Sequence, residues 1–183
     1  MRVLLDPESV TRGLRRVAGE IVERNHGTER VVIVGVRRGG VALSRELCRW
    51  LRELEGLEVP SGTVDITLYR DDVATALPNP KIGPSEIPCA LDGKTVVLVD
   101  DVLHTGRTVR AALDALMDYG RPRRVELAVL VDRGGRELPI QATYVVRAVE
   151  VSPTERIDVV DRPDGISALV QPANAPSVPP GLA

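Results

Sequence analysis

The sequence has little of what marks secreted, zinc-binding or membrane proteins. Its 183 residues include two cysteines, Cys48 and Cys89, too few for a disulfide framework and without the spacing of a zinc site. No apolar run approaches the roughly 20 residues of a transmembrane helix. Charged residues follow Met1 within a few positions, so we expect no signal peptide. These absences indicate a cytoplasmic protein without a membrane partner.

Aromatic residues and excess positive charge are also scarce. Aromatics make up 2% of the chain and phenylalanine is absent, whereas hydrophobic residues reach 43%. The core must therefore consist of Val, Leu, Ile and Ala, which suit strands buried on both faces. The formal net charge of -2 excludes a whole-chain attraction to nucleic acid, but it allows a local basic face.

Helix-like and strand-like patterns alternate along the chain. Apolar residues recur at helical spacing in three segments, residues 8–25, 40–54 and 108–120. Runs rich in β-branched residues predict strands at 30–36, 63–69, 95–100, 124–132 and 143–151. The alternation predicts an α/β fold with a central, mainly parallel sheet flanked by helices. Ligands of such sheets gather at the carboxyl ends of the strands.

Two segments lack any period. Residues 70–94 contain four prolines, and a structureless stretch of this length in a compact domain is often a flexible lid loop. Residues 172–183 have the composition of a disordered tail. We therefore expect one domain over residues 1–171, with the lid inserted in it.

The segment "TVVLVDDVLHTGRTV", residues 95–109, carries the strongest chemical signal. A buried strand runs into Asp100 and Asp101, and the chain then turns through Thr105 and Gly106 into a helix. Backbone N–H groups of such a turn bind phosphate, and Thr105 and Thr108 add hydroxyl donors. The carboxylates accept hydrogen bonds from vicinal hydroxyls and attract a cation. Both halves match a phosphorylated sugar with Mg²⁺.

A purely structural role for this segment is less favoured. A lone acidic pair before an ordinary helix would be read as helix caps, with Thr105 and Thr108 as local caps. The acidic pair, the Thr-Gly turn and the helix entry together favour the phosphosugar site. The chain has neither a Walker A loop nor a dinucleotide-binding G-x-G-x-x-G motif.

Residues 95–109 resemble the phosphoribosyl-pyrophosphate (PRPP) motif of type I phosphoribosyltransferases. Three longer stretches narrow the resemblance: "DITLYRDD" at 65–72, "LVDDVLHTGRTVRAALDAL" at 98–116 and "GRPRRVELAVLVDRGGRELPI" at 120–140. Together they are similar to the PyrR family, pyrimidine-operon attenuation regulators that are also uracil phosphoribosyltransferases. The resemblance covers residues from about 5 to about 144 and implies the type I phosphoribosyltransferase fold.

The resemblance implies a PRPP site built from the residues that follow two strands. Its members here are Arg37, Arg38, Gly39, Gly40, Asp100, Asp101, Val102, Leu103, His104, Thr105, Gly106, Arg107 and Thr108. Mg²⁺ would bind through PRPP and water, without a direct protein ligand. The chain reads Arg37-Arg38-Gly39-Gly40 where family members carry Lys- or His-Thr-Arg-Gly, so a solvated loop is the alternative there.

The implied reaction is displacement of pyrophosphate at the ribose anomeric carbon by uracil. Asp101, beside Asp100, is the expected electrostatic stabiliser, and Arg70 at the start of the lid would reach the departing pyrophosphate. A lid has a purpose because hydrolysis of PRPP competes. Base binding is expected at the ends of the next two strands, by Val131, Asp132, Arg133, Val145 and Val146.

The family also implies mRNA attenuation controlled by UMP or UTP, with pyr mRNA bound across a homodimer or higher homo-oligomer. Its cationic candidates here are Arg12, Arg15, Arg16 and Arg136. Gly19, Gly135 and Gln141 stand where family members carry two histidines and an arginine. A solvated helix face, with Glu20 and Glu23 balancing the charge, is the plain alternative.

Two other functions remain open from the sequence. One is a phosphoribosyltransferase for another base, because the strand at 145–149 departs from the family pattern and Val146, in place of a family glycine, could crowd the base pocket. The other is a nucleotide-sensing RNA-binding regulator with little catalysis. The intact segment around Asp100 and Asp101 favours the enzymes.

Overall fold

The structure is a computed structural model that describes residues 1–69 and 85–176. Its centre is a five-stranded sheet in which every neighbouring pair is parallel. The strands in spatial order are β3 (Ser61–Val64), β2 (Val31–Val36), β4 (Thr95–Leu103), β5 (Arg124–Asp132) and β6 (Tyr144–Ala148). The predicted α/β fold is confirmed.

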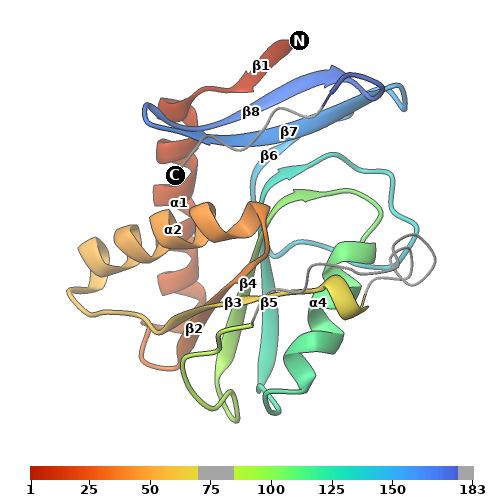
Figure 1. Cartoon of the computed structure of the whole chain (residues 1–183). Helices are drawn as coiled ribbons and strands as arrows, with labels where there is room; N and C mark the ends of the chain where they lie inside the picture. Colours follow the sequence, from red (N-terminus) through yellow and green to blue (C-terminus); the bar gives the residue numbers. More distant parts are fainter. Residues whose placement is uncertain (70–84, 177–183) are drawn as a thin grey trace.

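Helices cover both faces of this sheet (Figure 1). The helices α1 (Pro7–Asn25) and α2 (Gly39–Glu55) lie on one face, and α4 (Arg107–Met117) lies on the other. Each face has its own apolar core, with alternate strand residues such as Val97 toward α1 and α2 and Leu98 toward α4. All six residues of β2 are buried, as expected for a strand covered on both sides.

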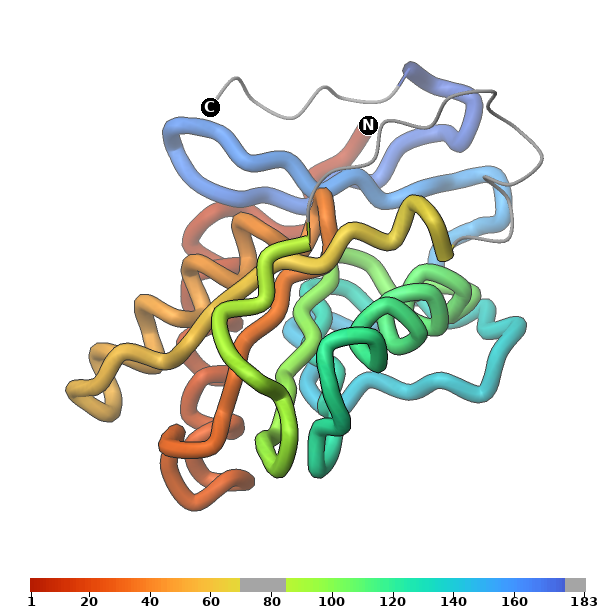
Figure 2. Tube along the Cα trace, turned by 60° about the horizontal axis from the view of Figure 1, so that its bottom comes forward, coloured from red at the N-terminus to blue at the C-terminus, as the bar shows by residue number. Residues whose placement is uncertain are grey.

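A second sheet lies across the carboxyl ends of the parallel strands (Figures 1 and 2). It is antiparallel and consists of β1 (Arg2–Leu5), β8 (Gly165–Pro172) and β7 (Glu155–Arg162), in that order. We call it the hood. It contacts the central sheet through β7 and β4 and shares the core of α1 and α2. The sequence patterns did not predict it.

The prediction of a strand over residues 63–69 is wrong beyond Val64. The Asp65 carboxylate accepts a hydrogen bond from the Thr67 backbone N–H at 2.8 Å, which bends the chain away from the sheet. A 3₁₀ turn, Thr67–Tyr69, follows. The alternation of polar and apolar residues thus continued past the point where a local turn ended the strand.

Residues 85–94 of the predicted lid are ordered along the sheet. Glu86 and Thr63 exchange two backbone hydrogen bonds of 2.8 Å, so this segment covers the free edge of β3. The rest of the predicted lid, residues 70–84 with Arg70, lies outside the described residues. Of the predicted tail, Pro172 ends β8 and residues 173–176 follow it.

The opposite edge of the sheet, β6, is covered by a side chain from α1. Arg16 donates to the backbone carbonyls of Val145 at 2.8 Å and Val146 at 3.3 Å, and it also pairs with Glu20. The two strand carbonyls are therefore satisfied without a further strand. Over the described ranges, none of the helices has the length and hydropathy to cross a bilayer.

Candidate active site at the carboxyl edge of the sheet

Two adjacent carboxylates lie at the carboxyl end of β4, below the hood. Asp100 is 3% exposed, and its Oδ1 accepts the Asp101 backbone N–H at 3.0 Å. Asp101 is less deeply enclosed, and its Oδ1 accepts the Val102 N–H at 2.7 Å. The strand thus delivers two negative groups to the sheet edge where parallel-sheet ligands bind.

The electrostatic setting of Asp101 opposes its charge. Burial raises the pKa of the Asp101 carboxyl group, and the carboxylate of Asp158 on β7 raises it further. Within the described ranges, no lysine or arginine forms an ion pair with Asp101. The ionised form therefore lacks a cationic partner, and a ligand with positive character would stabilise it.

The loop between β2 and α2 packs directly on these carboxylates. A Cβ atom on Gly39 would lie 2.0 Å from Asp101 Oδ2, and one on Gly40 would lie 2.0 Å from the Val99 carbonyl oxygen. Only glycine allows this approach. The Arg37–Arg38 peptide bond is cis. Arg37 contacts Thr63 Oγ1 at 3.3 Å and Glu86 at 3.8 Å, whereas Arg38 is exposed.

Beyond Asp101 the chain turns into α4. Val102 and buried Leu103 complete β4, and Gly106 adopts a left-handed conformation with φ of 91°. The Thr105 hydroxyl accepts the Arg107 N–H at 3.3 Å, and α4 begins at Arg107 with Thr108 in its first turn. The start of a helix next to a hydroxyl-rich turn is a binding place for phosphate.

A second loop, after β5, braces this turn. The Arg136 guanidinium binds Asp132 Oδ2 at 2.5 Å and the carbonyls of His104 and Ile140 at 2.9 Å each. Burial tends to raise the pKa of Asp132, but hydrogen bonds from Arg136 and the Gly134 N–H outweigh it and lower that pKa. Arg136 therefore holds the turn before α4 and the loop after β5 together, the two segments predicted to bind phosphate and base.

His104 lies between the two loops. Its exposed imidazole lies so close to Gly135 that a Cβ atom there would lie 2.8 Å from Nε2. Burial, reinforced by nearby Arg133, lowers the pKa of the imidazole. The ring is therefore mainly neutral at neutral pH.

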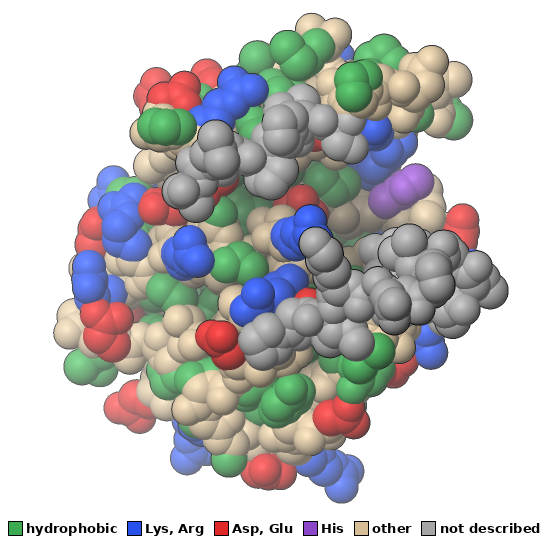
Figure 3. Space-filling view, in the orientation of Figure 1, with side chains coloured by type: hydrophobic (Ala, Val, Ile, Leu, Met, Phe, Trp, Pro, Cys, Tyr) green, Lys and Arg blue, Asp and Glu red, His purple; other side chains and the backbone are tan. Residues whose placement is uncertain are grey.

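The whole edge forms a hollow between the hood and the central sheet. Figure 3 shows acidic and basic side chains next to each other in this hollow. The pair of carboxylates and the turn into α4 follow one another at the end of β4, on this side of the sheet. Residues far apart in the sequence, from 37–40, 100–108 and 132–136, meet there as predicted for ends of parallel strands.

Comparison with known proteins decides the family. Residues 4–159 match the family model described as "Phosphoribosyl transferase domain". The "Bifunctional protein PyrR" of Geobacter sp. (strain M21) is 56% identical over 157 residues, covering 86% of this chain and 89% of the relative. The PyrR protein of Thermus thermophilus is 52% identical over 163 residues, covering 88% and 90%. This chain belongs to the PyrR family.

Solved structures agree on the fold. A hypoxanthine-guanine phosphoribosyltransferase from Bacillus anthracis has a TM-score of 0.69 at 19% identity, covering 92% of this chain and 98% of its own. The hypoxanthine phosphoribosyltransferase of Trypanosoma cruzi has a TM-score of 0.68 at 19% identity, covering 94% and 97%. At this identity the likeness shows the type I phosphoribosyltransferase fold, and with family membership it makes this PyrR chain a pentosyltransferase.

The base-side residues predicted from the sequence occupy the ends of β5 and β6. Val131 is buried in β5, Asp132 is paired with Arg136, and Arg133 has a buried Nε atom without a hydrogen-bond partner among the described residues. Val145 packs toward α4, whereas Val146 faces α1. A Cβ atom on Gly13 would lie 2.2 Å from Val146 Cγ1.

The expected crowding of the base pocket by Val146 therefore has no counterpart in the structure. Neighbouring residues of a strand point to opposite faces, and Val146 takes the α1 face. Gly13 supplies the space that the larger side chain needs.

The arginines predicted to contact RNA lie in two places. Arg12 pairs with Glu8 at 2.5 Å, Arg16 caps β6, and Arg15 lies 5.4 Å from the ring centroid of Trp50. Arg136 is part of the base-side loop instead. Arg12, Arg15 and Arg16 thus share one helix face, and Arg136 does not join them.

Sequence reasoning missed the contribution of the hood. Asp158 accepts hydrogen bonds from Arg156 at 3.2 Å and from buried Gln171, and its carboxylate acts on the pKa of Asp101. The sequence does contain a signal for β7 and β8. Polar and apolar residues alternate on both sides of Asp164-Gly165, a dipeptide typical of tight hairpin turns.

The side chains of this site could supply only some of the ligands that a magnesium ion needs. In the described portion of the PyrR chain, no cluster of three or more His, Cys, Asp or Glu side chains could hold a metal ion. Asp100 and Asp101 supply hard oxygen donors, but Mg²⁺ favours six ligands. Phosphoribosyltransferases generally use Mg²⁺ together with PRPP, whose oxygens can complete such a shell.

Proposed function

We propose that this PyrR protein transfers ribose 5-phosphate from PRPP to uracil, giving UMP and diphosphate. It also regulates pyrimidine biosynthesis genes by mRNA attenuation in response to UMP or UTP. The observation that carries the catalytic half is the geometry at the end of β4: two adjacent carboxylates are followed by a turn that leads into the start of α4. Family membership supports the regulatory half.

In this proposal a different set of residues binds each part of PRPP. The turn from Val102 to Thr108 binds the 5′-phosphate through backbone N–H groups, with the positive end of α4 behind it. Asp100 and Asp101 accept the ribose hydroxyls. The loop from Arg37 to Gly40 holds the pyrophosphate, whose negative charge its two guanidinium groups match.

The proposed role of Asp101 is electrostatic. As pyrophosphate departs, the anomeric carbon and ring oxygen gain positive charge. The carboxylate of Asp101, which has no cationic partner among the described residues, gains most from that charge, so it stabilises the transition state more than the ground state. Mg²⁺, held mainly through PRPP and water, would neutralise the negative charge of the pyrophosphate. Arg70, outside the described residues, is proposed to assist the leaving group.

Uracil is the base that this arrangement supports. One part of the case for another base was that Val146 would crowd the pocket, and Val146 packs against Gly13 instead. Backbone groups around Val131 to Arg133 and at Val145 are proposed to read the alternating donors and acceptors of uracil.

A steady-state assay tests the catalytic half. The protein is given Mg²⁺ and PRPP with uracil, orotate, hypoxanthine or guanine in parallel, and Asp100→Asn/Asp101→Asn is the control. UMP formation that the double variant loses would support the proposal. Turnover of a different base, or none with a folded protein that binds UMP, would contradict it.

RNA binding tests the regulatory half separately. Binding of a pyr leader RNA is measured with and without UMP, for the native protein and for Arg12→Ala/Arg15→Ala. Neither residue contacts the carboxyl edge, so UMP formation serves as the control for folding. Equal RNA affinity of the native protein with and without UMP would contradict attenuation in response to this nucleotide.

A further inference from the structure

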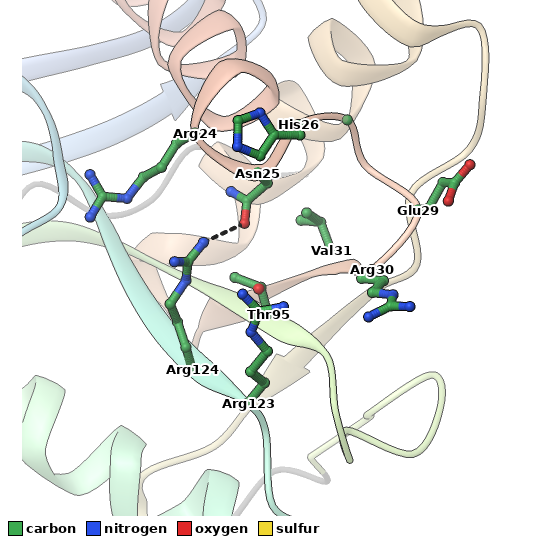
Figure 4. A pocket seen from close by; sticks show the side chains of 10 residues that line it. Arg24, Asn25, His26, Glu29, Arg30, Val31, Thr95, Arg123 and Arg124 are labelled. Atoms are coloured by element: carbon green, nitrogen blue, oxygen red, sulfur yellow. Dashed lines mark hydrogen bonds between the residues drawn. The ribbon is translucent and has the colours of Figure 1, made fainter.

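A basic pocket lies at the amino edge of the central sheet, opposite the hood. It has a volume of about 360 Å³, within the usual range for small-molecule pockets of about 300–1,000 Å³. Its ten lining residues come from the end of α1, the loop into β2 and the starts of β4 and β5 (Figure 4), and they include Arg24, Arg30, Arg123 and Arg124. Four of these ten residues are arginines, although the chain as a whole is acidic.

Two of the four arginines are fixed by a buried carboxylate. Glu126 on β5 is 3% exposed and binds Arg124 at 2.9 Å and Arg24 at 3.3 Å. Asn25 and Tyr144 donate to its other oxygen at 3.1 and 2.6 Å. Glu126 therefore has donors for both oxygens and holds its two arginines in place before any ligand arrives.

Arg124 has one hydrogen-bond donor that this network does not use. Its NH2 group also donates to Asn25 Oδ1 at 2.9 Å, but its Nε is buried and has no hydrogen-bond partner in the described structure. A buried donor without a partner is uncommon and is satisfied by a ligand or water in many sites.

The other two arginines are not neutralised by the protein. Over the described residues, the side chains of Arg30 and Arg123 form no ion pair or hydrogen bond. In Figure 4 Arg123 rises beside Arg124 from the start of β5, and Arg30 lies on the other side of Thr95. Glu29 is the single acidic residue of the lining. The pocket thus presents unpaired guanidinium groups around a polar hollow.

The carbonyl groups at the end of α1 would repel an anion if they were open. Three of these carbonyls are occupied, because the N–H groups of His26 and Gly27 donate to Glu23 and Val22, and Asn25 Nδ2 donates to Ile21. The helix end therefore opposes an anion less than an uncapped end would.

We propose that this amino-edge pocket binds the phosphate group of a small molecule. Guanidinium groups on opposite walls offer the paired N–H donors that phosphate oxygens accept, with two of them already positioned. The site is distinct from the PRPP site. Thr95 and Asp100 are five residues apart on one strand, which is about 17 Å at 3.3 Å per residue. The alternative is that water alone solvates the arginines.

Amide NMR spectra of the deuterated full-length protein, titrated with inorganic phosphate at constant ionic strength, test the proposal. The two sites report separately: Gly27, Thr95 and Arg124 for the pocket, and Thr105 to Thr108 for the PRPP turn. We expect saturable shifts at the pocket amides. In Arg30→Ala/Arg123→Ala the pocket affinity should fall at least about tenfold, because two charge-assisted donors are lost.

A matched variant removes the same charge elsewhere. Arg2→Ala/Arg45→Ala should keep the phosphate affinity of the pocket, and Arg30→Lys/Arg123→Lys should keep part of it. UMP formation should stay within about twofold in all three, since distant sites act independently. This test therefore does not depend on the proposed function.

Three results would overturn the proposal. One is the absence of saturable shifts at the pocket amides, and another is an equal loss of affinity in both alanine variants, which would indicate diffuse screening. The third is binding of a short RNA at these amides without any response to phosphate, pyrophosphate or UMP, which would make the pocket an RNA contact instead.

Discussion

The amino and carboxyl edges of the central sheet each hold a carboxylate in enclosed surroundings. The groups that surround these two carboxylates are of opposite kinds. At the amino edge, Glu126 is surrounded by two arginines, an asparagine and a tyrosine hydroxyl. At the carboxyl edge, Asp101 has backbone N–H partners and a second carboxylate, Asp158, close enough to raise its pKa. One carboxylate is matched by donors from the protein, and the other is the one that we propose acts on a ligand.

This difference separates structural from functional burial of charge. A buried carboxylate with matching donors costs little and fixes its neighbours, whereas one without a cation lowers stability until something positive arrives. Glu126 is the more buried of the two, whereas Asp101 is partly enclosed. The partners of each carboxylate distinguish them.

The largest effect should come from removing the charge at the carboxyl edge. Asp101→Asn should lower kcat/KM for UMP formation about 100- to 1,000-fold, the usual cost of losing one electrostatic stabiliser of a transition state. Steady-state kinetics with saturating Mg²⁺ measure it. Near-native turnover in this variant would remove Asp101 from the catalytic machinery.

Displacing the same carboxylate without removing it should have the next largest effect. In Gly39→Ala the new methyl group would lie 2.0 Å from Asp101 Oδ2, so the carboxylate must move. A misplacement of this size costs about 100-fold in turnover. Gly19→Ala on α1 is the control, since a Cβ atom there meets nothing within 4 Å. If both variants keep full activity, the position of Asp101 is not critical.

At the amino edge the effect should fall on stability. Glu126→Ala leaves Arg24, Arg124 and Tyr144 without their acceptor and should lower the free energy of unfolding by about 2–3 kcal/mol. Urea denaturation measures it. Glu53→Ala, which breaks an exposed pair with Arg49, should cost less than about 1 kcal/mol. Similar costs for both would erase the contrast between the two edges.

The smallest effect should be a pH-dependent gain in stability at the carboxyl edge. Because the folded protein raises the pKa of Asp101, ionisation of this group destabilises the fold as pH rises through that pKa. Asp101→Asn should therefore melt at a higher temperature than the native protein at neutral pH. The difference should shrink toward about pH 4, where the unfolded carboxyl group also becomes protonated. A lower melting temperature of the variant at neutral pH would contradict this sign.

Local sequence signals predicted the carboxyl edge well. The strand into Asp100 and Asp101, the left-handed Gly106 and the start of α4 follow from residue order, because one short segment contains the whole turn. Local signals failed where a side chain changed the path of the chain, as Asp65 does after β3. Only one pairing of the hood, β1 with β8, joins the two ends of the chain and has no local signal, whereas β7 and β8 form a local hairpin that was overlooked.

The amino-edge pocket could not be predicted in this way. Arg24 and Arg124 are separated by 99 other residues, and no local pattern indicates that both bind one glutamate. Glu126 itself stands in an apolar strand, where a single acidic residue gives no sign of its partners. The same holds for Gly13 and Val146, whose sizes fit each other across α1 and β6.

The two outermost strands of the central sheet, β3 and β6, are each covered by another part of the chain. This covering limits how copies of this protein can associate. A strand with open N–H and C=O groups invites another chain to pair with it and extend the sheet. Here Glu86 occupies the outer side of β3, and Arg16 takes two carbonyls of β6. Pairing of a strand from another copy is thereby hindered at these positions of β3 and β6.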